Sequence, residues 1–274
     1  MISISKEEAK KIKDSISFLI VTATDIETEL FKNHLSPIEG RSDLLVLYFD
    51  NQAYTIGKFG LYSIIHVQCS MGSVSRDSSL NTTKDSIDFW EPTAIIMLGI
   101  AFGSSSKKYN IGDVLISETV IPYEPSRIGK DRTIYRGNSM LSGKILFNRF
   151  KNFNDWKYEL PNKQIAQKVP GGILSGEKLI DNEEFKKILL NNFSTAVGGE
   201  MEAVGVCSAA EHSGLHEWII VKGICDWADG KKGYKKKLRQ TIAMTSAIDL
   251  CLNLFSVEHI LDDLKKNLIM TNTI

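Results

Sequence analysis

Trp218-Ile-Ile-Val221 and the segment that follows it, Gly223-Ile-Cys-Asp-Trp-Ala-Asp229, are the part of the sequence that decides the fold. An apolar run is followed there by carboxylates, and the same order recurs where Gly199-Glu-Met-Glu-Ala203 follows the run 194–197. Buried parallel strands read as continuous apolar runs, and ligands of open α/β sheets gather beyond their carboxyl ends. The acids that this pattern places at a ligand-binding edge are Glu200, Glu202, Asp226 and Asp229.

These acids also fit a purely structural role. A carboxylate at a helix N-terminus accepts hydrogen bonds from free backbone N–H groups and is stabilised by the helix dipole. Either interpretation fits any one of the acids taken alone. A third acidic turn, Asp25–Glu29, follows the apolar run 18–23, and the recurrence favours a functional site.

The composition is that of an ordinary globular protein. The chain has 274 residues, of which 43% are hydrophobic and 24% charged, enough for one α/β domain with a large core. Lys and Arg number 33, as do Asp and Glu, so no overall basic field would attract nucleic acid or an anionic membrane. We expect the partner to be a small molecule.

Motifs of secretion, membrane insertion and metal binding are missing from the sequence. The 4 cysteines have no Cys-x-x-Cys spacing and the 5 histidines form no ligand pattern, so we expect reduced core thiols, no metal and no cofactor. No signal-peptide pattern opens the sequence, and no apolar stretch approaches the roughly 20 residues of a membrane span. We therefore expect a cytoplasmic protein.

Hydrophobic periodicity predicts a single α/β domain with a central mixed β-sheet flanked by helices. Strands are predicted at residues 18–23, 44–49, 53–58, 63–69, 94–99 and 115–121. Helices are predicted at residues 5–13, 74–90, 140–150, 202–212, 236–255 and 257–268, with one more starting at a capping box of Asp181 and Glu184. Residues 122–138 read as a long loop. The expected divisions are an N-terminal helix (1–16), the main domain (17–255) and a C-terminal helical extension (256–274).

Short segments in a fixed order carry a resemblance to a known family. They are Val21–Glu27, Cys69–Ser73, Leu98–Gly103, Ile111–Val114, Leu174–Lys178, Gly199–Ala203 and Gly223–Asp229. From about Ser17 to Phe255, the sequence resembles the nucleoside phosphorylase and nucleosidase superfamily, which includes purine nucleoside phosphorylase and methylthioadenosine/S-adenosylhomocysteine nucleosidase. The resemblance implies a three-layer α/β sandwich and an enzyme that acts on an N-glycosidic bond.

The resemblance also implies roles for individual residues. Glu202 would bind the ribose hydroxyls, with Met201 packing beside it. Asp226 would protonate or hydrogen-bond the departing purine, and Glu27 would activate the attacking water, as in glycoside hydrolysis. Further positions that would contact the base or the ribose are Gly99, Ile100, Leu179 and Trp227, although Leu179 and Trp227 fit core packing as well.

Departures from the family favour hydrolysis over phosphorolysis. Purine nucleoside phosphorylases grip phosphate with an arginine just before the glycine of the central strand, where this sequence has Met97 and Leu98. A buried phosphate without cations is costly. Ile100 replaces the serine that is common after that glycine, which changes the hydrogen bonding around the base.

Basic residues near the proposed site predict a phosphorylated substrate. They are the lysine run 231–237 and the loop residues Arg127, Lys130, Arg132 and Arg136. The combination of the motifs at 123–125, 175–178, 198–202 and 222–232 resembles the nucleosidase-type effector domains of bacterial immune systems, some of which cleave ATP or related purine nucleotides. This resemblance adds Lys178, Lys231 and Lys232 to the arginines as candidates for phosphate binding. The resemblance implies an antiphage defence effector that acts on ATP or a related adenine nucleotide. Taken alone, the lysine run 231–237 fits a solvated basic face better than a phosphate site.

Two alternative functions stay open. One is phosphate-dependent cleavage of purine nucleosides, and the other is a non-catalytic module that senses a nucleotide. The acids Glu27, Glu202 and Asp226 together favour an enzyme, because binding alone needs no water-activating carboxylate. Family members are commonly dimers or hexamers, so we expect a homo-oligomer. The apolar stripe of residues 257–268 indicates docking to the same chain, a twin subunit or a regulatory partner protein.

Overall fold

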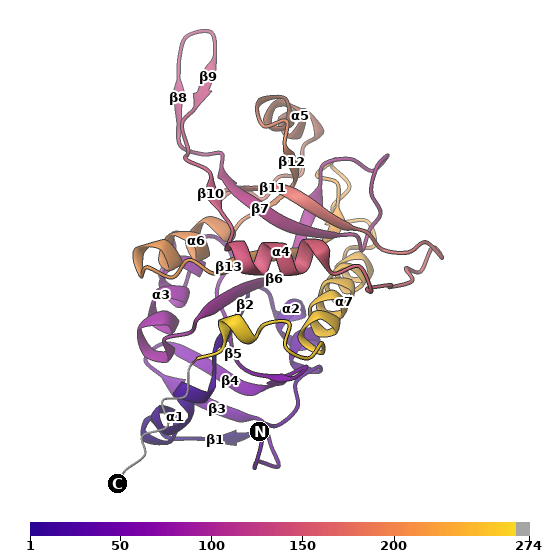
Figure 1. The fold of residues 1–274 in the computed structure, drawn as a ribbon. Coiled ribbons are helices and arrows are strands. Elements are labelled where there is room, and N and C mark those ends of the chain that lie inside the picture. The colour runs from indigo at the N-terminus through magenta and orange to yellow at the C-terminus, as the bar shows by residue number, and fades with distance from the viewer. Residues whose placement is uncertain (267–274) are drawn as a thin grey trace.

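A central sheet of 11 strands runs through the computed structural model, which describes residues 1–266 (Figure 1). The path of the sheet is β1 (Ile2–Ser3), β3 (Leu45–Phe49), β4 (Gln52–Phe59), β5 (Tyr62–Gln68), β2 (Phe18–Thr22), β6 (Ala94–Gly103), β12 (Ala196–Glu200), β11 (Lys168–Ser175), β7 (Val114–Pro122) and β10 (Met140–Leu141). Strand β13 (Trp218–Asp226) lies off this path and pairs with both β6 and β7. The apolar run that decides the fold is therefore in the middle of the sheet.

The sheet is mixed, as expected from the sequence. Strand β6 pairs in parallel with β2 and β13 and antiparallel with β12. Strands β3, β4 and β5 form antiparallel hairpins, and their tight turns place Asp50 and Gly60 at positive φ angles of 51° and 58°. Such turns have the twist that matches the flanking strands. The expected α/β class with one central mixed sheet is confirmed.

Helices cover both faces of the sheet (Figure 1). The buried clusters place α1 (Lys6–Ile12), α3 (Ser79–Trp90) and α6 (Ala203–His212) on one face, and α2 (Asp25–Lys32), α4 (Lys144–Asn152) and α7 (Lys236–Phe255) on the other. Strand β2 is buried on both faces: Leu19 and Val21 pack on the side of α1, α3 and α6, while Phe18 and Ile20 pack on the side of α2, α4 and α7. A strand buried on both faces needs apolar residues throughout, which is the continuous run of its sequence.

Some expected boundaries are wrong. The stretch 122–138, expected to be a loop, contains a hairpin of β8 (Ser126–Ile128) and β9 (Thr133–Tyr135). The helix expected at 140–150 begins only at Lys144, after strand β10. The helix expected at 74–90 begins at Ser79. In α5 (Glu183–Asn192) the N-cap is Asn182, whose side chain accepts the N–H of Phe185, and not the expected Asp181.

The described part of the C-terminal extension is not the expected helix. His259 has a φ of 65°, which interrupts helical geometry, and residues 257–266 form turns with one short 3-10 helix, Asp262–Leu264. Leu261 and Leu264 are buried against the α7 face of the sheet, and the Lys266 ammonium donates to the carbonyls of Lys13 and Trp90. This segment therefore packs on its own chain. The rest of the expected helix lies outside the described residues.

The N-terminal segment also belongs to the main body of the fold. Strand β1 pairs with β3, and Ala9 of α1 is buried in the core. The capping box that Ser5 and Glu8 predict is present at the start of α1. All 4 cysteines are buried free thiols. Within residues 1–266, no helix is both long enough and apolar enough to cross a membrane.

Candidate active site

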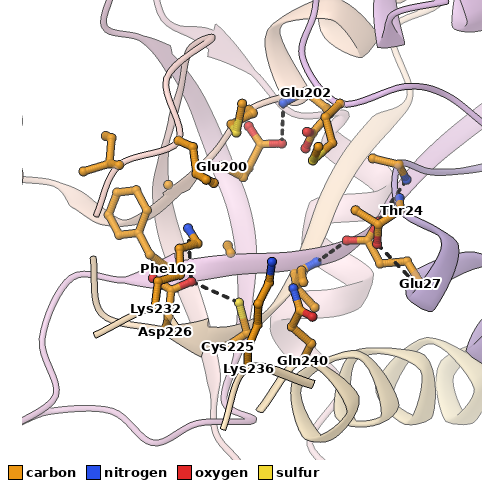
Figure 2. A pocket seen from close by; sticks show the side chains of 18 of the residues that line it. Thr24, Glu27, Phe102, Glu200, Glu202, Cys225, Asp226, Lys232, Lys236 and Gln240 are labelled. Atoms are coloured by element: carbon orange, nitrogen blue, oxygen red, sulfur yellow. Dashed lines mark hydrogen bonds and ion pairs between the residues drawn. The ribbon is translucent and has the colours of Figure 1, made fainter. Parts of the chain in front are cut away.

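A cavity of about 340 Å³ opens where β2, β6, β12 and β13 meet the first residues of α2 and α7 (Figure 2). Its lining includes the three acids that the sequence singles out for chemistry, Glu27, Glu202 and Asp226. Glu27 is far from Glu202 and Asp226 in the sequence, and only the sheet brings them together. A concave cavity with convergent polar groups is the usual form of a small-molecule site.

Glu27 is held rigidly at the edge of this cavity. Its Oε2 accepts the backbone N–H groups of Ala23 (2.9 Å) and Thr24 (2.8 Å), and its Oε1 accepts that of Ile100 (2.8 Å). The bond from Thr24, together with the Glu27 N–H that donates to the Thr24 hydroxyl, forms a capping box at the start of α2. Glu27 is only 2% exposed, so the capping role and a position in the cavity are combined in one side chain. The two interpretations of this acid do not exclude each other.

Asp226 is the last residue of β13 and faces the cavity from the opposite side of β6. Its Oδ1 accepts the N–H of Ala228 (2.9 Å), which lies in a left-handed turn with φ 48°. Its Oδ2 accepts the Cys225 thiol (3.3 Å) and lies 3.4 Å from the Lys232 ammonium. Oδ1 is therefore engaged by the turn, and Oδ2 contacts the Cys225 thiol and the Lys232 ammonium.

Glu200 and Glu202 are two residues apart and do different things. Glu200 accepts the N–H groups of Glu202 (3.0 Å) and Ala203 (2.9 Å), so it caps the N-terminus of α6. This is the structural role that helix-terminal acids often have. Glu202 instead accepts the N–H of Gly72 (3.3 Å) from a loop across the cavity. Its carboxylate is available to a ligand, whereas that of Glu200 is largely occupied.

A buried lysine that the sequence reading missed connects these acids. Lys222 of β13 is fully buried, and its Nζ lies 3.5 Å from Oε2 of both Glu200 and Glu202. A side chain at Gly99 would clash with the Glu27 carboxylate and come within 2.9 Å of the Lys222 Nζ. Gly99 therefore lets Glu27 and Lys222 approach each other. The sequence feature that could have identified Lys222 is its position as a single lysine inside an otherwise apolar predicted strand.

The charges in this cluster shift the pKa of its members. Burial alone would lower the pKa of Lys222, but the carboxylates of Glu202 and Glu200 outweigh it and raise that pKa. Burial raises the pKa of Glu202, and the nearby Glu200 charge raises it further, while Lys222 opposes both. One ammonium thus faces a surplus of carboxylates, so this side of the cavity is a negative region.

A loop and a turn from distant parts of the chain meet over the cavity. The loop residue Ser73 donates from its N–H and its hydroxyl to Oε1 of Glu177. Gly72, at a φ of 89°, precedes it, and Met71 lines the cavity together with Lys178 and Leu179 of the Glu177 turn. This contact joins two segments whose sequence motifs are otherwise unconnected.

The structure brings together some of the residues selected from the sequence. Those that line the cavity, besides the three acids, are Ile100, Lys178, Leu179, Met201 and Lys232. Gly99 lies directly behind Glu27. Trp227 packs against the Gly103 backbone position, as core packing would require, and is not part of the lining.

Other selected residues lie elsewhere. Arg127, Arg132 and Arg136 are exposed on or beside the β8–β9 hairpin, which projects from the body (Figure 1). Lys231 is exposed in the turn after Asp226. None of these four lines the cavity as the described residues form it. The lining adds Phe102, Lys236 and Gln240, which the sequence reading did not select.

Fold and site together define an α/β protein that binds a small molecule among buried acids. The chain belongs to the phosphorylase superfamily, whose family model matches residues 17–255. This confirms the resemblance that the ordered sequence motifs carry, and it covers every acid of the cavity.

Individual relatives add detail. The chain is 29% identical over 256 residues to a death domain-containing ATP nucleosidase of Amphimedon queenslandica, covering 83% of this chain and 46% of that protein. It is 28% identical over 253 residues to the ATP nucleosidase Cap17 of Escherichia coli, covering 82% of this chain and 48% of that protein. The chain therefore spans about half the length of these two relatives.

A solved structure has the same fold. The methylthioadenosine/S-adenosylhomocysteine nucleosidase of Colwellia psychrerythraea, in complex with adenine, superposes with a TM-score of 0.73 at 18% identity. The match covers 88% of this chain and 95% of that one. It confirms the expected nucleoside phosphorylase-like architecture.

Proposed function

We propose that this chain is a nucleosidase that hydrolyses the N-glycosidic bond of ATP or a related adenine nucleotide, releasing the free base. The observation that carries the proposal is the pair of buried carboxylates, Glu27 and Asp226, which face one cavity from opposite sides of β6. Glycoside hydrolysis needs an acid at the leaving group and a base on water. The family membership and the names of the relatives support the same bond.

Each acid has a role in the proposed reaction. The purine lies by Asp226 and Phe102, and Asp226 assists departure of the base by protonating or hydrogen-bonding a purine nitrogen as the C1′–N bond breaks. Glu202 binds the ribose hydroxyls, because one carboxylate accepts two hydroxyl donors. Glu27 removes a proton from a water that attacks C1′ from the face opposite the base. The products are the free base and ribose, which keeps the 5′ substituent.

The charge around the sugar favours this reaction. Glu27, Glu200 and Glu202 surround a single ammonium, Lys222, so the region beside the ribose carries surplus negative charge. A developing oxocarbenium ion is positive and is stabilised there, in the way that preorganised charge stabilises transition states. A phosphate dianion at C1′ would be repelled by the same carboxylates. This supports hydrolysis over the alternative, phosphorolysis.

The proposal extends to the substrate and the setting. Lys178 and Lys232 line the cavity and give a phosphorylated substrate cationic partners. Two relatives are named ATP nucleosidases, which supports ATP over a nucleoside. In a cytoplasmic, homo-oligomeric protein, triggered cleavage of ATP would deplete the cell of nucleotide, which is the action proposed for an antiphage defence effector. The activating partner is proposed to act through residues 256–274.

The test is chromatographic detection of free base. Purified protein is incubated with ATP, AMP, adenosine, inosine and methylthioadenosine, each with and without inorganic phosphate. Adenine from ATP without phosphate supports the proposal, and Asp226→Asn and Glu27→Gln should each lower the rate at least 100-fold. Release only with phosphate would show a phosphorylase instead. Binding of ATP without release from any substrate would show a nucleotide-sensing module.

A further inference from the structure

The wall of the cavity formed by α7 has no role in the reaction described so far. Lys236 and Gln240 both line the cavity, and their spacing of four places them one turn apart on the same face of α7. Figure 2 shows their side chains reaching into the cavity from one side, while Glu202 lies on the other. The cavity thus has an acidic wall and, opposite it, a wall of cation and amide donors.

The positions of the hydroxyls and of C5′ on the ribose predict which part of a nucleotide faces each wall. In ribose the 2′ and 3′ hydroxyls lie along one edge of the ring, and C5′ leaves from C4′ toward the other side. If Glu202 binds the hydroxyls and Asp226 the base, the 5′ substituent is directed toward the α7 wall. Lys236 and Gln240 are then the first side chains that a 5′-phosphate meets.

The ion pairs of the other cavity lysines also favour Lys236 as the residue that binds the phosphate. Lys178 is paired with Glu124 at 2.6 Å, and Lys232 is paired with Asp226 at 3.4 Å. Lys236, in contrast, forms an ion pair with none of residues 1–266. Its charge is therefore available to a ligand without breaking a contact inside the protein. The Gln240 amide adds a neutral donor beside it.

We infer that Lys236 and Gln240 form a 5′-phosphate subsite that makes the enzyme select adenine nucleotides over nucleosides. This rests on the proposed function, since it uses the orientation of the sugar in that reaction. The contact is with the first phosphate, because Lys236 stands at the rim of the cavity, where a longer phosphate chain continues into solvent. AMP and ATP should therefore depend on Lys236 to a similar extent.

The experiment compares Lys236→Ala with wild type on ATP, AMP and adenosine. We expect kcat/KM for both nucleotides to fall about 10- to 100-fold, as for loss of a hydrogen bond to a charged group, while kcat/KM for adenosine stays within about twofold. Gln240→Ala should lower the nucleotide values less. The matched control is Lys237→Ala, which removes the adjacent lysine of α7 outside the cavity lining and should change none of them.

Equilibrium binding keeps the inference separate from the activity. In an Asp226→Asn background, calorimetric titration should show ATP and AMP bound about 10- to 100-fold more weakly when Lys236 is also replaced by Ala, with adenosine unaffected. If wild type releases no adenine but this difference appears, the proposed reaction fails and the subsite stands. Equal losses for nucleotides and adenosine, or no loss for nucleotides, would overturn the subsite.

Discussion

Replacing Lys222 by Met tests whether the buried acids depend on one cation. Lys222 Nζ lies 3.5 Å from a carboxylate oxygen of Glu200 and of Glu202, and all three side chains are buried. Methionine fills a similar volume with no charge. Because the carboxylates are largely buried, removing the ammonium leaves them without a compensating charge.

The size of the effect follows from these distances. At 3.5 Å and an effective dielectric constant of about 20, each pair contributes a Coulomb attraction of ~5 kcal/mol, part of which is lost to the cost of burying the charges. Breaking a buried pair by removing one partner typically costs about 3–5 kcal/mol, and we expect Lys222→Met to lower the free energy of unfolding by that amount at neutral pH.

The loss should depend on pH. Without Lys222, the pKa of Glu202 rises further above its ordinary value, so the folded variant holds a proton more tightly than the unfolded chain does. A raised carboxyl pKa makes stability fall as pH increases through the folded-state pKa. The deficit of the variant relative to wild type should therefore be smaller at pH 5 than at pH 8.

Urea unfolding followed by tryptophan fluorescence at pH 5 and pH 8 measures both quantities. Lys186→Met is the matched control, because Lys186 is also buried but donates to the backbone carbonyl of Trp227. It should cost about 1 kcal/mol, with a similar loss at both pH values. A deficit below 1 kcal/mol for Lys222→Met, or an equal deficit at both pH values, would refute the charge cluster as described.

Two further substitutions test positions that the cavity and the core require. Gly99→Ala should abolish most base release and lower the unfolding midpoint, because the added methyl group would displace Glu27 and Lys222. The control is Gly233→Ala, which has open space around it and should leave the midpoint unchanged. Burial lowers the pKa of His66 to about 3, so the free energy of unfolding of wild type should decrease as pH falls from about 6.5 toward 3. In His66→Gln, the free energy of unfolding measured in titrations should depend less on pH over this range. An equally steep slope in the variant would assign the acid sensitivity to other groups.

The elements that local pattern predicted well are those that bury one clear face. The helix 236–255 and the capping box at Ser5 depend on residues three or four apart, so residues close in the sequence carry the information. The tail 257–266 has helical spacing too, but its apolar residues are held against α7 and the sheet by contacts with distant segments. Tertiary contact overrode the periodicity there.

The sequence by itself determined the class of fold, because continuous apolar runs are local features, and its short ordered motifs carried the resemblance that indicated the family and the acids Glu27, Glu202 and Asp226. Only the tertiary structure decided what those acids meet. In the folded chain, β13 pairs with β6 and brings Lys222 next to the acids. Helix α7 places Lys236 in the wall of the cavity. A charge alters chemistry over a few ångströms in space, and the distance between two such charges is set by how the strands and helices pack.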